Sequence, residues 1–147
     1  MESNSSQNVL FQKIVAFTAA VHEVTHELTS GVKNEDVTPA QYKILEYMML
    51  SQPVTPSEIA DCVGLSLPNT SRELRKLLEK KLCEKAVDHS DRRRQLFRLS
   101  EDGQAMMNRI FAQVQKGFEQ RIAGLSNQEL TELEAAITLL QQTVFRQ

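Results

Sequence analysis

Apolar side chains recur at steps of three and four residues near the start of the chain, and polar side chains fill the positions between them. The apolar positions are Leu10, Ile14, Phe17, Val21, Val24 and Leu28. Steps of this size place every member of the set on one stripe of an α-helix. The pattern therefore predicts a first long helix over residues 9–29.

Two later segments contain residues that start helices. Residues 38–41 (TPAQ) and 55–58 (TPSE) each place Thr before Pro, with Gln or Glu at the third helical position. The Thr side chain can accept a hydrogen bond from a free backbone amide, and Pro fits the first helical turn because its fixed φ matches the helix. These signals predict helices from Pro39 to about Leu50 and from Pro56 to Cys62.

A turn and a further helix follow. Gly64 suits the left-handed backbone conformation that other residues resist, and Ser66 can cap the next helix, with Pro68 in its first turn. The packing stripe of that helix is expected to consist of Leu67, Leu74, Leu77, Leu78 and Leu82. The two helices and the turn between them predict a helix–turn–helix.

The hydrophobic period changes after Leu82. Residues 83–88 (CEKAVD) and 94–100 (RQLFRLS) are short and alternate loosely between apolar and polar positions, and the polar residues between them include Arg92 and Arg93. Such alternation is typical of β-strands. We therefore expect a two-stranded hairpin with the arginines at its tip.

Helical spacing returns from Glu101 onward. The apolar positions of this next helix are Met107, Ile110, Phe111, Val114, Phe118 and Ile122. Residues 126–129 (SNQE) then cap a last helix, whose apolar positions are Leu130, Leu133, Ile137, Leu140 and Val144. A stripe this narrow is typical of a helix that packs on another helix. Together with the first helix, the last helix would make a subunit interface.

The composition agrees with a mostly α fold that carries a small β-hairpin. The 147 residues fit a single domain, residues 1–147, and only 5% of them are aromatic. No stretch has the pattern of a signal peptide or a membrane span, so we expect a cytoplasmic protein with no membrane partner. Cys62 and Cys83 lack the spacing of a zinc site or an obvious disulfide, and we expect both to be buried thiols.

The net charge of −2 hides an uneven distribution. Residues 72–98 contain ten basic and five acidic side chains, so this segment carries +5 and the rest of the chain carries −7. A basic middle with acidic flanks can attract a polyanion locally while the protein stays soluble. The charge pattern therefore favours nucleic acid as a partner.

The second helix of the helix–turn–helix is the candidate reader of DNA. If its leucines face inward, the outward-facing residues are Asn69, Thr70, Arg72, Glu73, Lys76 and Lys80. Short polar residues followed by bases suit a helix whose N-terminal half enters a major groove, where Asn can read adenine and Arg can read guanine. We place Ser66 with this major-groove set and expect Arg75 and Lys80 to contact phosphates. For an isolated helix, a solvated face is the alternative interpretation.

Arg92, Arg93 and Arg94 repel one another and gain nothing from a core. Beside a helix–turn–helix, an arginine can enter a narrow minor groove, whose negative potential favours it, and Asp91 can hold a neighbouring guanidinium in place. We therefore expect residues 91–94 to contact DNA. The alternative is a solvated tip with local pairing between Asp and Arg.

The order of these elements and three stretches of sequence resemble the multiple-antibiotic-resistance regulator (MarR) family of winged helix–turn–helix proteins. The stretches are TPAQYKILEYM (38–48), PSEIADCVGLSLPNTSRELRKLLEKKL (56–82) and DHSDRRRQLFRLSEDG (88–103). The most specific part is DRR followed by LFRLSEDG, which is similar to the family's Asp-x-Arg wing and its exit into the next helix. The resemblance covers nearly the whole chain, and it departs at Leu82, where the family usually has Gly.

The resemblance implies a winged helix–turn–helix over residues 38–100 and helical dimerisation parts over residues 8–30 and 101–146. It also implies that Asp91 orients Arg93 and that Arg93 enters the minor groove. The residues that it places in or near the major groove are Asn69, Thr70, Arg72 and Lys76. The function implied is that of a homodimeric DNA-binding transcriptional regulator, a repressor that reads a pseudo-palindromic operator and can respond to a small lipophilic or phenolic ligand.

Other classes of function have less support. The chain has three His and five Gly without a nucleophile–base pair or a phosphate-binding loop, so we expect no enzyme. His22 and His26 lie one helical turn apart, but two ligands do not complete a metal site, and we expect neither metal nor cofactor. The alternative function is a winged-helix protein–protein assembly module without sequence-specific DNA binding.

Overall fold

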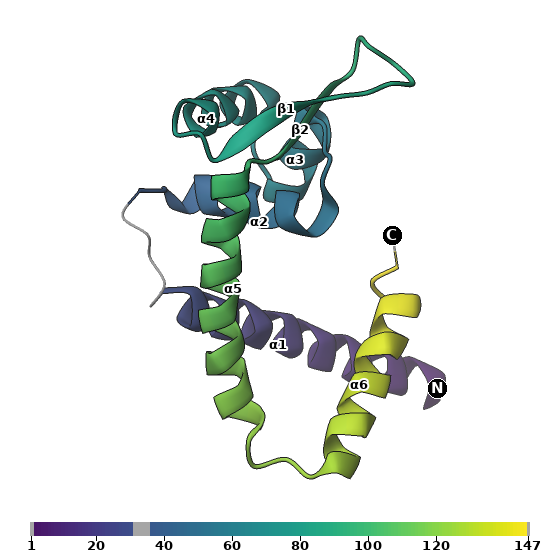
Figure 1. Cartoon of the computed structure of the whole chain (residues 1–147). Coiled ribbons are helices and arrows are strands. Elements are labelled where there is room, and N and C mark those ends of the chain that lie inside the picture. The colour runs from purple at the N-terminus through teal and green to yellow at the C-terminus, as the bar shows by residue number, and fades with distance from the viewer. Residues whose placement is uncertain (1, 31–35, 147) are drawn as a thin grey trace. The chain divides into compact units, whose positions relative to one another are not determined.

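The computed structural model describes residues 2–30 and 36–146, and Figure 1 shows its elements. In chain order they are α1 (Glu2–Ser30), α2 (Pro39–Ser51), α3 (Pro56–Val63), α4 (Leu67–Glu79), β1 (Cys83–Val87), β2 (Gln95–Leu99), α5 (Glu101–Ile122) and α6 (Asn127–Gln142). The chain divides into two compact units, Met1–Val114 and Gln115–Gln147. The predicted mostly α fold with one small hairpin is confirmed.

The helix starts predicted from capping residues are correct. Thr38 and Ser126 each form a capping box, in which the side chain accepts a hydrogen bond from the third helical amide and the cap's own amide donates to the side chain of that third residue. Thr55 and Ser66 also cap α3 and α4, since their side chains accept from the amides of Glu58 and Asn69. These bonds satisfy amides that a helix start otherwise leaves free.

Two helix boundaries differ from the prediction. α1 begins at Glu2 rather than near residue 9, because polar residues can extend a helix without contributing to its apolar stripe. α6 ends at Gln142, so Val144 lies beyond the helix that it was expected to complete.

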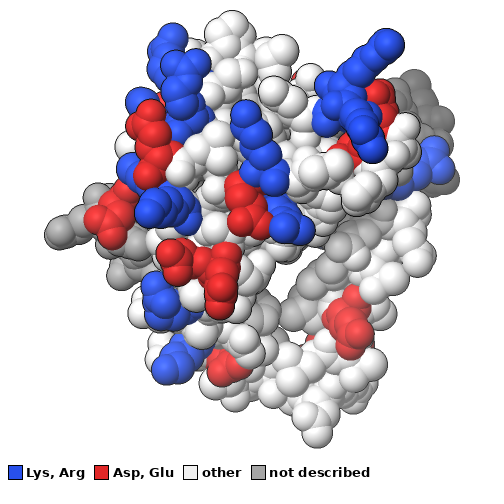
Figure 2. Space-filling model, turned by 45° about the horizontal axis from the view of Figure 1, so that its top comes forward, with Lys and Arg blue, Asp and Glu red and all other residues white. Residues whose placement is uncertain are grey.

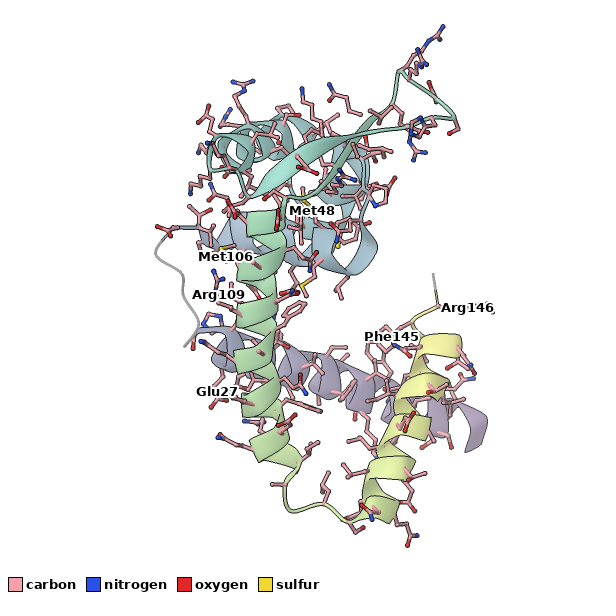
Figure 3. The ribbon with its side chains drawn as sticks, in the orientation of Figure 1. Glu27, Met48, Met106, Arg109, Phe145 and Arg146 are labelled. Atoms are coloured by element: carbon pink, nitrogen blue, oxygen red, sulfur yellow. The ribbon has the colours of Figure 1, made fainter. Side chains whose placement is uncertain are left out.

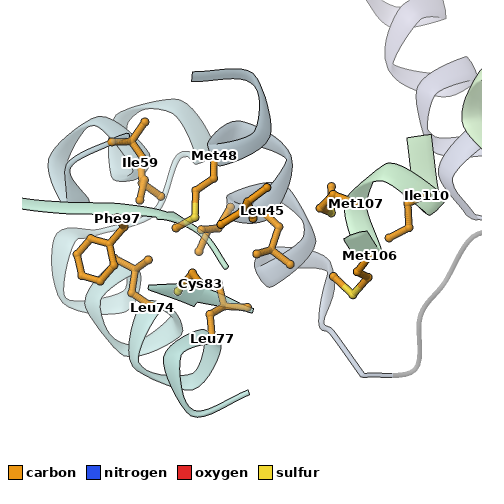
Figure 4. Packing of buried hydrophobic residues seen from close by; sticks show 13 residues of the cluster. Leu45, Met48, Ile59, Leu74, Leu77, Cys83, Phe97, Met106, Met107 and Ile110 are labelled. Carbon is orange, nitrogen blue, oxygen red and sulfur yellow. The ribbon is translucent and has the colours of Figure 1, made fainter. Parts of the chain in front are cut away.

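The core of the winged-helix body, which we define as residues 39–99, joins its helices to the hairpin. The buried cluster consists of Ile44, Leu45, Met48, Val54, Ile59, Leu74, Leu77, Cys83, Phe97 and Leu99, together with Met106, Met107 and Ile110 of α5. Figure 4 shows these side chains meeting between the helices and the strands. Because α4 and β2 contribute to one cluster, they behave as parts of one rigid body.

The hairpin is antiparallel, with Cys83 opposite Leu99 and Val87 opposite Gln95. Its second strand also bonds to the segment before α3: the Phe97 amide donates to the Val54 carbonyl at 2.8 Å, and the Val54 amide donates to the Phe97 carbonyl at 2.9 Å. The sequence does not predict this bridge, because a single residue has no alternation to detect.

The turn after α4 contains a lysine in a backbone conformation that is usually adopted by glycine. Lys81 adopts a left-handed conformation with φ of 59°, and the Leu82 amide donates to the Leu77 carbonyl at 3.0 Å. The left-handed position at a helix end is usually occupied by Gly. The chain therefore makes this turn at Lys81, one residue before Leu82.

Gly103, in the first turn of α5, is needed for a different reason. A Cβ atom at this position would lie 1.9 Å from the carbonyl oxygen of Leu82, far inside van der Waals contact. The same carbonyl accepts a hydrogen bond from the Ser100 amide at 3.2 Å. The glycine therefore allows the end of α4 and the start of α5 to lie against each other.

Candidate nucleic-acid interface

The start of α4 is built by local chemistry. Gly64 closes α3 in a left-handed conformation with φ of 71°, and Ser66 then caps α4. Leu74 and Leu77 are buried in the core, whereas Asn69, Arg72 and the other residues on the opposite side of the helix are exposed. The helix therefore presents a polar and basic face to solvent.

Two residues of α4 face the opposite way from the prediction. Thr70 is fully buried, at 0% exposure, and the hydroxyl of Thr70 has no hydrogen-bond partner among the described residues. Leu67 is 49% exposed. Thr70 lies four residues before Leu74 and seven before Leu77, so it belongs to the buried stripe, and the expectation that it faces outward is wrong. Leu67 lies in the first turn, outside that stripe.

Glu73 and Lys80 are held toward α2 by one buried amide. The Gln41 side chain donates from Nε2 to Glu73 at 2.9 Å and accepts at Oε1 from the Lys80 ammonium at 2.8 Å. Lys80 also donates to the Asp36 carbonyl. The hydrogen bond from Gln41, aided by Lys76 at 3.3 Å, lowers the pKa of Glu73. Glu73 and Lys80 therefore already form hydrogen bonds within the domain, and these bonds compete with any contact to DNA.

The tip of the hairpin is shaped by two aspartates. Asp88 accepts hydrogen bonds at Oδ1 from the Ser90 amide at 2.9 Å, the Ser90 hydroxyl at 2.6 Å and the Asp91 amide at 3.2 Å. Asp91 accepts at Oδ1 from the backbone amide of Arg93 at 3.0 Å. Asp91 therefore orients the backbone of Arg93, whereas the sequence suggests that it holds a guanidinium.

The three arginines of the tip have different surroundings. Arg94 forms ion pairs with Glu58 at 3.0 Å and with Asp88 at 3.9 Å. Within the described residues, Arg92 and Arg93 have no ion pair, and both are exposed. Figure 3 shows long side chains with terminal nitrogens standing out from the hairpin tip. Two of the three predicted wing arginines are thus free to meet a ligand.

The α4 helix and the hairpin border one hollow. Leu74, Leu78 and Phe97 supply its apolar residues, and Arg75 of α4 and Lys85 of β1 are exposed cations along it. Figure 2 shows groups of Lys and Arg side chains over this part of the molecule, with Asp and Glu side chains among them. The basic face of α4 and the basic hairpin therefore belong to one surface.

Sequence reasoning misses Gln41, Glu58, Asp88 and Lys85 as residues of this region. The sequence identifies Gln41 and Glu58 only as residues of helix starts, because their partners lie 32 and 36 residues away along the chain. Lys85 is included in the net charge of residues 72–98, but the sequence does not predict that Lys85 lies beside α4. A local pattern carries no signal for such long-range partners.

The other candidate sites gain nothing from the structure. Among residues 2–30 and 36–146, no group of three or more His, Cys, Asp or Glu could hold a metal ion, and no helix is long and apolar enough to cross a membrane.

Cys62 is exposed, so the expectation of a buried thiol there is wrong, because the last turn of α3 turns this residue outward. Cys83 is buried, and burial raises the pKa of its thiol to about 11.

Comparison with known families and structures agrees with this geometry. The sequence model of the MarR family matches residues 35–94. A MarR family protein from Bacillus stearothermophilus is 17% identical, with 97% of this chain and 98% of that chain covered and a TM-score of 0.78.

MepR, a transcription regulator of the Staphylococcus aureus multidrug efflux pump MepA, is a second relative. A variant of MepR bound to an oligodeoxyribonucleotide is 23% identical, over 90% of this chain and 97% of that chain, with a TM-score of 0.58. MepR bound to ethidium bromide is 24% identical, over 88% and 94%, with a TM-score of 0.63. The structural matches show the winged-helix fold, and the match of the MarR family model to residues 35–94 agrees with the resemblance seen in the sequence.

Proposed function

We propose that this chain, which carries the winged helix–turn–helix of the MarR family of transcription regulators, is a DNA-binding repressor that acts as a homodimer on a pseudo-palindromic operator. In this proposal α4 enters the major groove, and the hairpin tip enters the adjacent minor groove. The solved complex of a MepR variant with an oligodeoxyribonucleotide supports DNA as the partner.

One observation carries the proposal: the basic face of α4 and the free arginines of the hairpin extend from one packed body. Leu74 and Leu77 of α4 share a buried cluster with Phe97 and Leu99 of β2. Two basic elements that move together can approach one duplex without losing further conformational freedom. An assembly module would not need cations on both elements.

Burial and internal hydrogen bonds narrow the set of base-reading residues. Thr70 is buried, and Glu73 and Lys80 have partners on α2 and in the segment before it. Asn69 and Arg72 remain exposed near the start of α4, where a recognition helix reads bases. We assign base reading to these two residues, with Ser66 beside them. We assign phosphate contacts to Arg75 and to Lys76, which stays half-exposed although it pairs with Glu73 at 3.3 Å.

Arg93 is the assigned minor-groove residue. Its backbone amide is bonded to Asp91, so the start of its side chain is fixed, while the guanidinium has no ion pair within the described part of the chain. A fixed base with a free charged end suits insertion into a narrow groove of negative potential. Arg92, next to it, is assigned to the same groove or its phosphates.

The apolar faces of α1 and α6 support the dimer. On α1, Val9, Leu10, Phe11, Val15, Phe17 and Val21 are between 46% and 66% exposed. On α6, Leu133, Ile137 and Leu139 are also exposed. Apolar surface of this extent favours burial against a partner. A two-fold dimer would place its two recognition helices about 34–36 Å apart, one helical turn of DNA.

A lipophilic ligand is proposed as the signal that releases DNA. MepR has been solved with ethidium bromide bound, which supports this class of ligand.

The experiment is DNA binding by fluorescence anisotropy, with an operator first selected from genomic fragments of the source organism. If each subunit contacts three to five phosphates, log K should fall against log salt with a slope of about −5 to −9. Arg72→Ala should weaken operator binding by about 1–3 kcal/mol, because the variant cannot form a bidentate bond to a base. Lys43→Ala, at an exposed position of α2, is the matched control and should bind like wild type. A shallow salt slope, or equal binding by the two variants, would contradict the proposal.

A further inference from the structure

We infer that Arg94 is a positioning residue that ties the hairpin to the start of α3, rather than an arginine that contacts DNA. This inference rests on the proposed function for its meaning. Its structural part, a tether between hairpin and α3, can be tested without DNA.

The tether begins at Glu58, a residue fixed by its own helix. The Glu58 amide donates to the Thr55 hydroxyl oxygen at 3.2 Å, and the Thr55 hydroxyl donates to Glu58 Oε1 at 3.1 Å. The same Oε1 accepts from Arg94 Nη2 at 3.0 Å. The carboxylate that holds Arg94 is therefore anchored in the first turn of α3.

The tether ends at Asp88, the residue that shapes the hairpin tip. Asp88 Oδ1 accepts three hydrogen bonds from Ser90 and Asp91, whereas Oδ2 faces Arg94 Nη1 at 3.9 Å. Arg94 also donates its backbone amide to the Asp91 carbonyl at 3.1 Å. One guanidinium thus joins the fixed start of α3 to the carboxylate that folds the tip.

Charge explains why this arginine is a poor DNA contact. Arg94 lies between two carboxylates, so the three side chains together carry a charge of −1, which repels phosphate. Arg92 and Arg93 carry no such neutralising partner among the described residues. The three adjacent arginines therefore divide into two that reach outward and one that holds the loop.

The expected effect is small, because the pair is partly solvated. The side chains of Arg94 and Glu58 are 53% and 41% exposed, and such pairs contribute little. Removal of the tether from both subunits of a dimer should weaken operator binding by about two- to ten-fold.

Glu58→Gln separates a positioning role from a purely electrostatic one, because the two roles predict opposite changes in operator affinity. Removing a negative charge near DNA should strengthen binding if electrostatics alone acts. If Glu58 positions the hairpin through Arg94, the variant should bind the operator about two- to ten-fold more weakly. Glu79→Gln removes an exposed charge from the last turn of α4 and is the matched control, which should bind as tightly as wild type or more tightly.

Arg94→Ala tests the same residue through the salt dependence. If Arg94 bound one phosphate in each subunit of a dimer, its removal would change the slope of log K against log salt by about 1.8. The inference predicts weaker binding with an unchanged slope. A slope that becomes shallower by that amount would overturn it.

Limited digestion with trypsin tests the tether without DNA. Glu58→Gln keeps all three arginines, so faster cleavage at residues 92–94 than in wild type would report a looser hairpin. Equal cleavage rates, or operator binding by Glu58→Gln that equals or exceeds that of wild type, would overturn the inference. If wild type itself bound no DNA at low salt, the proposed function would fail, while the digestion result would still decide the tether.

Discussion

Replacing Gly103 by Ala tests the join between the winged-helix body and α5. The added Cβ would lie 1.9 Å from the oxygen and 2.9 Å from the carbon of the Leu82 carbonyl. The clashing atoms are backbone, so a side-chain rotation cannot relieve the overlap. The start of α5 would have to move by about 1.5 Å relative to Leu82 to restore a normal separation.

The size of the effect follows from three contributions. Overpacking a tight contact costs about 1–3 kcal/mol, and displacement of Leu82 weakens its hydrogen bond with the Ser100 amide, worth about 0.5–1.5 kcal/mol. The higher helix propensity of Ala offsets about 1 kcal/mol of this destabilisation. We expect Gly103→Ala to lower the free energy of unfolding by about 1–3 kcal/mol.

The assay is urea unfolding followed by circular dichroism, with all variants at the same protein concentration because dimerisation contributes to stability. Gly124→Ala is the matched control, since a Cβ at Gly124 would meet no atom within 4 Å. Its free energy of unfolding should stay within about 0.5 kcal/mol of wild type. A Gly103→Ala variant as stable as wild type, or a Gly124→Ala variant that is equally destabilised, would refute the reasoning.

Three further predictions concern single residues. Lys81→Gly should raise the free energy of unfolding by about 0.5–1 kcal/mol in the same urea assay, because Gly adopts the left-handed φ of 59° without strain; a decrease in stability would contradict this. Iodoacetamide at about pH 8 should label exposed Cys62 in the folded protein, whereas Cys83, buried and with its pKa raised to about 11, should react only after unfolding, as mass spectrometry would show; rapid double labelling would count against the fold. Hydrogen bonds from Ser90 lower the pKa of Asp88 in the folded protein below its ordinary value of 3.8. The bonds that stabilise the tip should therefore be complete above pH 3.8 and be lost as the pH falls through the lowered pKa. The NMR shift of the Ser90 amide should titrate with a midpoint below 3.8, and a higher midpoint would contradict the account.

Features that depend on neighbouring residues could be predicted from the sequence. Thr38, Thr55, Ser66 and Ser126 cap their helices as expected, because a cap and its partner amide lie three residues apart. The hairpin was predictable for the same reason, since its two strands follow one another. Boundaries set by polar residues, such as the start of α1, were not predictable from an apolar period.

The candidate site was predicted only in part. The predicted packing stripe of α4 was correct at Leu74 and Leu77 but wrong in the first turn, because Leu67 has the character of a core residue and Thr70 that of a surface residue. Burial of a small polar side chain depends on the elements packed against it. The bonds from Gln41 to Glu73 and from Arg94 to Glu58 join residues more than thirty positions apart, and these contacts decide which charged residues remain free for DNA.

Methylation of the bound operator by dimethyl sulfate tests the central claim most directly, because the reagent reports guanine N7 in the major groove and adenine N3 in the minor groove. If α4 and the hairpin tip of one subunit contact the same duplex, wild type should protect guanines in each half-site and adenines flanking them. Arg93→Ala should lose the protection of the flanking adenines and keep that of the guanines. Protection that is identical for wild type and Arg93→Ala, or confined to the major groove in both, would contradict the account.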